Sequence, residues 1–249
     1  MAETALKMPK VSIITPTIRE KGLSLVEQGL KNQTFKDFEW LIGSPFEPTG
    51  LKQPFKWVKD EFEGGFWTLN RIYNELFRQA QGKIIVTLQD WIWIQPNGIE
   101  KFVLAVDKKD SVVSGVGDQF TELDQYGKPI FKVWGDPRKT EEFGSFYECF
   151  WEDCEWNWAA FPKDAVYEVG GMDEELDFLG YGGDQYQICE RMSEVGVRFF
   201  LDQTNESRTL RHGRVKDWDH NHVLLNGMYD KRKTVLNKEG KWPVLDYLK

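Results

Sequence analysis

The sequence predicts an α/β fold with a doubly wound, mostly parallel sheet flanked by helices. First, short β-branched runs alternate with segments of helical periodicity along the first half of the chain. Second, the apolar run at 83–91 is too short for a helix and lies between Gly82 and a turn at 96–98, which is typical of a strand buried on both faces. Third, the chain has 249 residues, of which 41% are hydrophobic, and this is enough to build a substantial core.

The first half of the chain supplies most of the regular elements. A β-branched run at 11–15 is stopped by Pro16, and behind it Leu23, Val26 and Leu30 recur at helical spacing. The same two patterns, apolar runs for strands and apolar stripes for helices, predict the remaining elements. We expect strands at 11–15, 38–42, 55–58, 83–90 and 111–116, and helices at 24–31, 69–80 and 98–107.

The alternation of strands and helices breaks at residues 118–161. This stretch is acidic, aromatic and loop-like, with a hairpin turn expected at 127–129. Regular structure resumes at Pro162, with a helix at 184–195 and a strand at 197–201. We therefore expect an N-terminal tail at 1–10, one domain at 11–204 with halves at 11–117 and 118–204, and a C-terminal extension at 205–249.

Composition excludes several classes of protein. A net charge of −8 argues against a general nucleic-acid binder, which needs a basic face to release counterions. The three cysteines cannot all pair and lack the spacing of a metal or redox motif, so we expect reduced thiols. Since no apolar run has the length of a signal peptide or a transmembrane segment, we expect a cytoplasmic protein. The sequence does not indicate an oligomeric state.

Two segments place polar groups where predicted strands end, and ligands of open α/β sheets bind at such ends. Asp90 follows the strand at 83–90, where it either caps the next turn or is presented to a cation and a diphosphate. Residues 15–19 form an ordinary strand-to-helix turn or offer hydroxyls and a guanidinium to a diphosphate or a base. Neither a P-loop nor a GxGxxG motif is present.

Asp184 opens a predicted helix directly after Gly182 and Gly183. An aspartate there can cap the helix, act as a general base toward an acceptor hydroxyl, or do both. The two glycines would let the backbone approach a substrate closely. Among the three histidines, His212 has the most basic setting and could face a diphosphate, but a structural or surface role is the better explanation for each of them.

An aromatic stretch at 143–161 holds further candidates. Rings such as Trp156 and Trp158 can pack on the C–H faces of a carbohydrate, or they can close the core over the sheet. Four acidic residues of the same stretch could accept hydrogen bonds from sugar hydroxyls: Glu148, Glu152, Asp153 and Glu155.

Taken in order, six segments resemble family 2 glycosyltransferases, the inverting enzymes with the GT-A fold. The segments are VSIITPT at 11–17, NQTFKDFE at 32–39, YN with AQGKII at 73–85, LQD at 88–90, VGGMDE at 169–174, and GGDQ through Arg191 at 182–191. The match runs from Val11 to His212, which is most of the chain.

This resemblance implies a nucleotide-sugar donor and a divalent cation, Mn²⁺ or Mg²⁺. The cation would be held by Asp90 and His212 and would neutralise charge on the leaving nucleotide. Asp184 would be the base that activates the acceptor. The implied donor contacts are Pro16, Thr17, Arg19, Asn74, Gln89 and Asp90, and the implied acceptor contacts are Trp156, Trp158, Gly182 and Gly183.

Three positions depart from the family pattern. Gly43 and Ser44 stand where an acidic pair usually follows the second strand. Trp91 or Trp93 replaces the second acidic residue after Asp90. The acidic pair at the helix start is Asp184 and Gln185 here, so the base is Asp184 or lies elsewhere in the chain.

Rival functions remain open at this point. The missing acidic partners also suit a non-catalytic sugar- or nucleotide-sugar-binding protein. A nucleotidyltransferase uses a similar sheet, but the chain lacks its glycine-rich basic first loop. For a glycosyltransferase, the acceptor is a carbohydrate, a glycolipid or a modified base in DNA. The DNA acceptor is kept open by basic residues near the C-terminus: Arg208, Arg211, Arg214, Lys231, Arg232 and Lys233.

Overall fold

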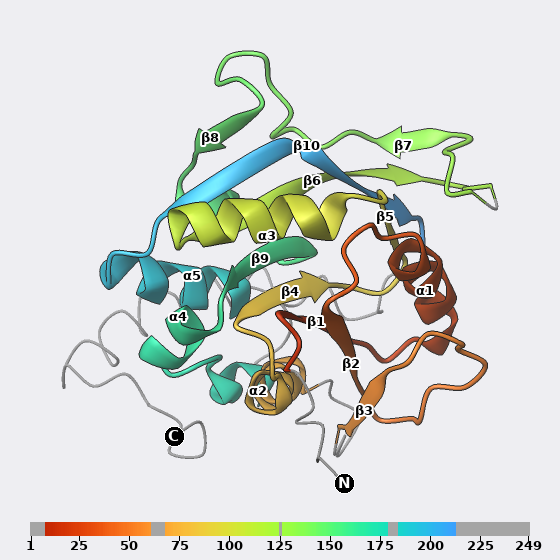
Figure 1. The fold of residues 1–249 in the computed structure, drawn as a ribbon, viewed down its shortest axis with the longest axis horizontal. Helices are drawn as coiled ribbons and strands as arrows, with labels where there is room; N and C mark the ends of the chain where they lie inside the picture. Colours follow the sequence, from red (N-terminus) through yellow and green to blue (C-terminus); the bar gives the residue numbers. More distant parts are fainter. Residues whose placement is uncertain (1–7, 61–67, 125, 179–183, 213–249) are drawn as a thin grey trace, which may run out of the picture.

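The fold is organised around one large sheet. The structure, a computed structural model, describes residues 8–60, 68–124, 126–178 and 184–212. In these residues the strands lie in the order β3-β2-β1-β4-β9-β6-β10-β5, with β7 attached to β6 and β8 attached to β10. Helices flank the sheet (Figure 1), so the expected α/β fold is confirmed.

Four neighbouring strands from the first half of the chain are parallel: β1 (Val11–Pro16), β2 (Phe38–Ser44), β3 (Lys56–Lys59) and β4 (Ile84–Leu88). β1 lies between β2 and β4, and every residue of β1 and β4 is buried. Burial on both faces is typical of parallel strands that helices cover. Because all four strands run in the same direction, their carboxyl ends meet at one edge of the sheet.

The other half of the sheet is mixed. β9 (Trp158–Pro162) lies between β4 and β6 (Val112–Phe120) and is antiparallel to both. β10 (Phe199–Leu210) is parallel to β6, while β5 (Ile92–Ile94) pairs antiparallel with the end of β10. The sheet is therefore less parallel than the sequence predicts, because β9 lies in a stretch expected to be loop-like and β5 was not expected.

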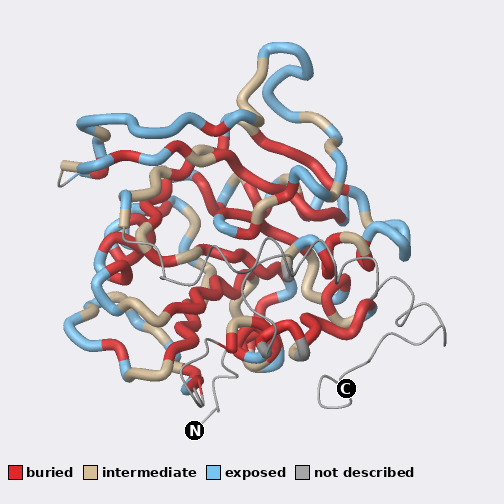
Figure 2. Tube along the Cα trace, turned by 180° about the vertical axis from the view of Figure 1, so that it is seen from behind, coloured by how far each residue is buried: buried red, intermediate tan, exposed pale blue. Residues whose placement is uncertain are grey.

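Helices cover both faces of the sheet. One face carries α1 (Leu23–Lys31) and α3 (Gly98–Lys109), and the other carries α2 (Leu69–Gln79), α4 (Lys163–Glu168) and α5 (Asp184–Glu194). Ile13 of β1 belongs to the core under α1 and α3, whereas Ile14 belongs to the core under the other three helices. Successive strand residues thus point into opposite cores, and Figure 2 shows buried chain running through the middle of the molecule.

Shorter elements complete the fold: η1 (Glu20–Gly22), β7 (Lys132–Trp134), β8 (Phe146–Glu148), η2 (Trp151–Asp153) and η3 (Glu174–Phe178). β6 and β7 form a hairpin, and Gly127 has a φ of 75° in its turn, where the sequence predicts one. Among the described residues, no helix has the length and apolar character needed to cross a membrane.

β10 is longer than the sequence predicts. A polar extension was expected from Asn205, but the strand continues to Leu210 after a register shift between Asp202 and Glu206. Asn205 is fully buried because its side chain accepts a hydrogen bond from Trp158 Nε1 (3.2 Å) and donates one to the carbonyl oxygen of Gly98 (3.0 Å). These two hydrogen bonds therefore allow a polar segment, which the sequence places in a C-terminal extension, to form part of the sheet.

Candidate active site

Thr17, Arg19 and Asp90 meet at the carboxyl edge of the parallel strands. Pro16 is the last residue of β1, and Gln89 directly precedes Asp90 after β4, so both lie at the same edge. The Oδ2 atom of Asp90 accepts hydrogen bonds from Thr17 Oγ1 (2.6 Å) and Arg19 Nε (2.9 Å), and Arg19 Nη2 contacts Oδ1. The guanidinium therefore holds the carboxylate at two points, which is a strong and directional geometry for such a pair.

The backbone on both sides of this ion pair is fixed by close contacts. The Thr17 hydroxyl, fully buried, also accepts a hydrogen bond from the N–H of Arg19 (2.9 Å). Trp91, directly after Asp90, has a φ of 62°, a left-handed conformation that costs a non-glycine residue about 1–3 kcal/mol. A Cβ at Gly22 would lie 2.6 Å from Trp91 Cδ1, so glycine is required there for η1 to pack against the tryptophan.

His212 reaches the same place from the far end of the described chain. The N–H of Leu210 donates to the carbonyl oxygen of Trp91 (2.8 Å), and the His212 and Trp91 rings stack with centroids 5.9 Å apart. Burial and the positive charge of Arg19 lower the pKa of His212, although Asp90 acts in the opposite direction. The imidazole is therefore biased toward its neutral form, which is the form that can bind a metal ion.

The start of α5 lies at this edge too. The N–H of Trp156, just before β9, donates to Gln185 Oε1 in the first turn of α5 (3.1 Å). The N–H of Gln89 donates to the carbonyl oxygen of Asn157 (3.2 Å). The segment 156–157 therefore lies between the end of β4 and the beginning of α5.

Asp184, the expected base, is the first residue of α5. The partial positive charge at a helix N-terminus favours a carboxylate at this position. The structure thus brings the helix start near the Asp90 edge. The Asp184 side chain, and the whole of Gly182 and Gly183, lie outside the described residues.

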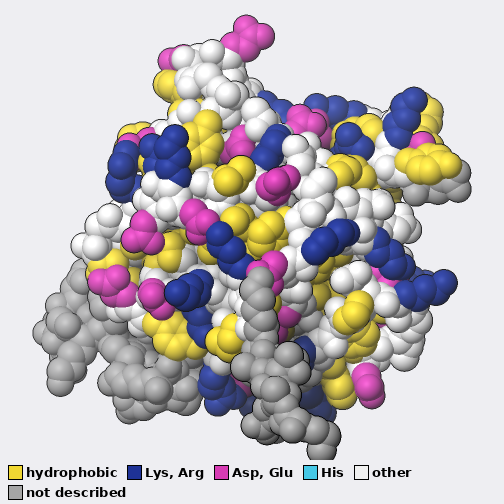
Figure 3. Space-filling model, in the orientation of Figure 1, with side chains coloured by type: hydrophobic (Ala, Val, Ile, Leu, Met, Phe, Trp, Pro, Cys, Tyr) yellow, Lys and Arg dark blue, Asp and Glu magenta, His cyan; other side chains and the backbone are white. Residues whose placement is uncertain are grey.

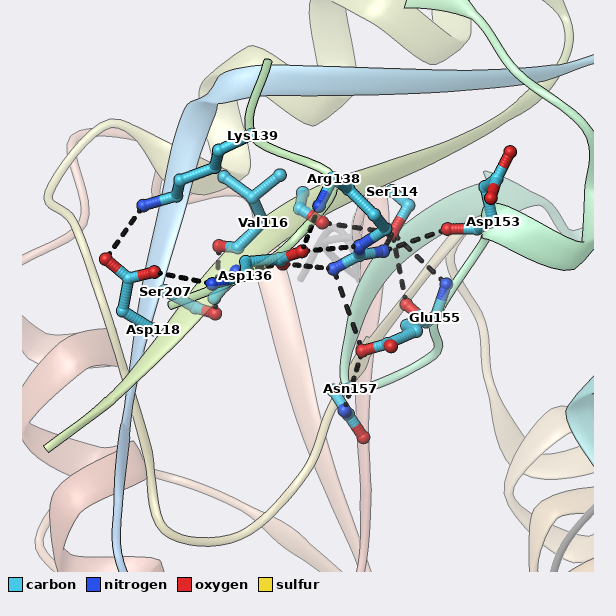
Figure 4. Close-up of polar contacts among 12 residues, drawn as sticks. Ser114, Val116, Asp118, Asp136, Arg138, Lys139, Asp153, Glu155, Asn157 and Ser207 are labelled. Atoms are coloured by element: carbon cyan, nitrogen blue, oxygen red, sulfur yellow. Dashed lines mark hydrogen bonds and ion pairs between the residues drawn. The ribbon is translucent and has the colours of Figure 1, made fainter. Parts of the chain in front are cut away.

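A second polar network, which the sequence did not predict, lies beside the start of β9 (Figure 4). Asp136 is buried and accepts hydrogen bonds from Arg138 Nε (2.9 Å), Arg138 Nη2 (2.5 Å) and the N–H of Gly117 (2.8 Å). Arg138 Nη1 donates to the carbonyl oxygen of Asp153 (2.9 Å), and Nη2 lies 3.6 Å from Glu155 Oε2. Burial alone would raise the pKa of Asp136, but the hydrogen bonds and the charge of Arg138 outweigh it and lower that pKa.

The sequence carries only a local signal for this network. Asp136 and Arg138 flank a proline, and an aspartate two residues before an arginine can pair with it across such a turn. The acidic residue near Arg138 in the fold depends on the position of β9 between β4 and β6, and the sequence did not predict β9. Glu155 was therefore only one of four acidic residues in an aromatic stretch.

Comparisons with known proteins identify the fold. No protein-family model and no curated protein matches the sequence. The solved structure of GalNAc-T7 with UDP, GalNAc and Mn²⁺ is similar, with a TM-score of 0.65 and 13% identity over 92% of this chain and 49% of that one. S. aureus TarS is similar with a TM-score of 0.62 and 13% identity over 96% of this chain and 41% of that one. The chain has a GT-A-like glycosyltransferase fold.

The GT-A-like fold is what these comparisons establish. The chain spans less than half the length of each of the two structures, and only 13% of the aligned residues are identical. A shared fold does not carry a shared substrate, because function resides in the residues of the site.

Within this GT-A-like fold, Asp90 and His212 are the described residues that offer metal ligands at the carboxyl edge of the parallel strands. A carboxylate oxygen and an imidazole nitrogen both suit Mn²⁺, so the donor types fit. Both oxygens of Asp90 already contact Arg19 or Thr17, and no three His, Cys, Asp or Glu residues of the described chain are grouped to hold a metal. Water or oxygen atoms of a bound ligand would have to complete the coordination.

Three predicted site residues lie in the core of the GT-A-like fold. Asn74 is fully buried, and its side chain donates to the carbonyl oxygen of Met172 (3.0 Å) and accepts from the N–H of the same residue (2.8 Å). Trp156 and Trp158 are 1% and 2% exposed and pack among apolar side chains of the two cores. Because contacts inside the fold occupy these three side chains, we do not include them in the proposed site.

Proposed function

We propose that this chain is a glycosyltransferase that moves a sugar from a nucleotide-sugar donor to an acceptor hydroxyl with inversion. The proposal is carried by the group of Thr17, Arg19 and Asp90 at the carboxyl edge of the parallel strands in a GT-A-like fold. A guanidinium and a hydroxyl at this edge suit a diphosphate. The crystallisation of GalNAc-T7 with UDP supports a nucleotide donor.

At the donor end, Arg19 is the principal positive charge. Its side chain is 27% exposed, so the guanidinium can contact diphosphate oxygens while Asp90 and Thr17 fix its loop. Pro16 and Gln89 border the same place. A Mn²⁺ or Mg²⁺ ion held by Asp90 and His212 would, when bound, neutralise charge on the leaving diphosphate.

At the acceptor end, Asp184 is the proposed general base. Inversion requires the acceptor oxygen to attack the anomeric carbon from the face opposite the leaving diphosphate. The end of β4 and the start of α5 lie on either side of residues 156–157, which supports placing the diphosphate at Asp90 and the base at Asp184. As the new C–O bond forms and the bond to the diphosphate breaks, Asp184 takes the proton of the acceptor hydroxyl.

We propose a carbohydrate acceptor ahead of a glycolipid or a modified base in DNA. On the face drawn in Figure 3, basic and acidic side chains are interspersed rather than gathered into one basic field. The guanidinium of Arg208 lies 4.7 Å from the Trp93 ring centroid and donates to the carbonyl oxygen of Gly127, so it is engaged within the fold. A DNA acceptor requires cations that can replace counterions along the phosphate backbone.

The proposed function is tested by looking for transfer directly. The purified chain is incubated with UDP-glucose, UDP-GalNAc or GDP-mannose, a panel of oligosaccharides, and Mn²⁺. Mass spectrometry detects the glycosylated product, and NMR reports its anomeric configuration. A product of inverted configuration supports the proposal, and a product of retained configuration contradicts the proposed mechanism.

A non-catalytic nucleotide-sugar-binding protein is the second candidate. It is favoured by the engagement of both Asp90 oxygens with neighbouring side chains, because a cation would have to compete with Arg19 and Thr17 for this carboxylate. Tight binding of a nucleotide sugar with neither transfer nor hydrolysis, across the same panel, would support this second function.

A further inference from the structure

Glu155 lies at the border of the proposed site, although no motif points to it. It immediately precedes the segment 156–157, which contacts Gln89 on one side and Gln185 of α5 on the other. Its side chain is 36% exposed, so the carboxylate is open to a ligand. The residues that follow it connect the end of β4, next to Asp90, with the first turn of α5, which begins at Asp184, and the transferred sugar has to lie between these two ends.

The Glu155 carboxylate forms an ion pair with Arg138. That guanidinium is itself fixed, because its Nε and Nη2 bind Asp136 and its Nη1 binds the carbonyl oxygen of Asp153. The Arg138 side chain is only 13% exposed, and its Nη2 faces Glu155 Oε2 at 3.6 Å. Arg138 is therefore a rigid support for the glutamate, as the dashed contacts in Figure 4 show.

Asn157 adds a second contact to the same carboxylate oxygen. Its Nδ2 donates to Glu155 Oε2 (3.2 Å), so both supports act on Oε2. Among the described residues, none donates a hydrogen bond to Glu155 Oε1. This arrangement leaves one carboxylate oxygen, and the exposed amide oxygen of Asn157, available as neighbouring acceptors for hydroxyl donors.

The geometry points to Glu155 and Asn157 as the residues that bind hydroxyl groups of the transferred sugar, with Arg138 as a positioning residue. Two acceptors next to each other match adjacent hydroxyls on a pyranose ring, and a hydrogen bond to a charged carboxylate is stronger than one to a neutral group. This inference rests on the proposed function, because it takes the donor to be a nucleotide sugar. The network beside β9 therefore recognises the sugar rather than the nucleotide.

The test compares a nucleotide sugar with the nucleotide alone. Isothermal titration measures the affinity of the full chain for UDP-glucose, UDP-GalNAc and GDP-mannose, and for UDP and GDP. We expect Glu155→Gln and Asn157→Ala each to weaken binding of the preferred nucleotide sugar about tenfold, and to leave the affinity for its nucleoside diphosphate unchanged. Arg138→Lys should weaken sugar-specific binding in the same way, but by less than Glu155→Gln.

Glu148→Gln is the matched control. Glu148 comes from the same acidic stretch and also pairs with an arginine, Arg198, but the pair is exposed, with Glu148 on β8 and Arg198 directly before β10. This variant should bind both kinds of ligand like the wild type. Thermal unfolding of every variant checks that the fold is retained.

The outcomes separate this inference from the proposed function. A loss at Glu155→Gln that is equal for the nucleotide sugar and the nucleoside diphosphate would overturn the sugar-binding role. Unchanged binding of both would overturn it as well, and in both cases the donor site itself would stand. Failure of the wild-type chain to bind any nucleotide sugar in a wide panel would overturn the proposed function and this inference together.

Discussion

Arg19 and Asp90 are 71 positions apart in the sequence, yet the guanidinium of one holds the carboxylate of the other at two points. Asp90 is only 3% exposed, and a carboxylate buried to this extent is strongly disfavoured without a partner. The ion pair therefore joins the carboxyl ends of β1 and β4 in the free protein. It also places a partly exposed cation where we propose that the donor diphosphate binds.

Removing the cation of this pair should destabilise the protein. We expect Arg19→Ala to lower the free energy of unfolding by about 1–3 kcal/mol, because Asp90 stays buried without its partner. Arg19→Lys keeps the charge but loses the two-point contact, so its loss should be smaller. Urea unfolding measures both variants. An Arg19→Ala protein as stable as the wild type would show that the ion pair does not form in solution.

If Asp184 is the general base, replacing it should lower the rate of transfer without weakening the binding of the nucleotide sugar. Asp184→Asn should lower kcat by about 10²- to 10⁴-fold, because the acceptor hydroxyl loses its proton acceptor, while nucleotide-sugar affinity stays unchanged. Asp164→Asn, in the first turn of the short helix α4, is a matched control and should keep both values. Steady-state kinetics and donor titration measure the two effects. Near-normal kcat in Asp184→Asn would place the base elsewhere.

The parallel half of the fold could be predicted because its signals are local. The strands β1 (VSIITP) and β4 (IIVTL) are rich in β-branched residues, and turn residues mark their ends. The central strand β9 has the sequence WAAFP, in which two alanines and a proline give little β propensity. It is a strand because it pairs with both β4 and β6, and these are long-range contacts that no short window of sequence contains.

For the site, the sequence predicts which residues take part better than it predicts which of them contact one another. Thr17, Arg19 and Asp90 were recognisable because each follows the end of a predicted strand, but their mutual contacts depend on the adjacency of β1 and β4. Asn74 shows the opposite case. A match to a family segment suggested donor binding, whereas its side chain holds the backbone of Met172. A residue that matches a family motif can have a structural role or a binding role, and only its contacts show which role it has.

The proposed cation predicts a reversible effect of chelation. If Asp90 and His212 hold Mn²⁺ during turnover, excess EDTA should abolish transfer and added Mn²⁺ should restore it. Asp90→Asn and His212→Gln should each require more Mn²⁺ for half-maximal rate, since each removes a ligand. Initial rates against free Mn²⁺ concentration measure this requirement. Full transfer in excess chelator would contradict a role for the cation in turnover. Arg19 would then be the positive charge that binds the diphosphate.

Asp118 and Asp136 should make the stability of the protein depend on pH. Burial would raise both pKa values, but hydrogen bonds and charges from Lys132, Lys139 and Arg138 outweigh burial and lower both below their ordinary value of 3.8. Each carboxyl thus binds its proton more weakly in the folded protein than in the unfolded chain. The stabilisation is fully present above the ordinary value and is lost as pH falls through the lowered folded pKa.

Urea unfolding between pH 7 and pH 3 can isolate the contribution of Asp136. At pH 7 we expect Asp136→Asn to unfold with a free energy about 1–3 kcal/mol below the wild type, because Arg138 loses a charged partner inside the network. This difference should shrink below about pH 4, because the carboxyl of the unfolded chain then binds a proton that the folded protein binds only at lower pH. Asp107→Asn, which removes an exposed carboxylate paired with Lys10, should change stability by less than about 0.5 kcal/mol. A difference for Asp136→Asn that stays constant down to pH 3 would mean that Asp136 is not held ionised by Arg138, and the rigid support proposed for Glu155 would lose its anchor.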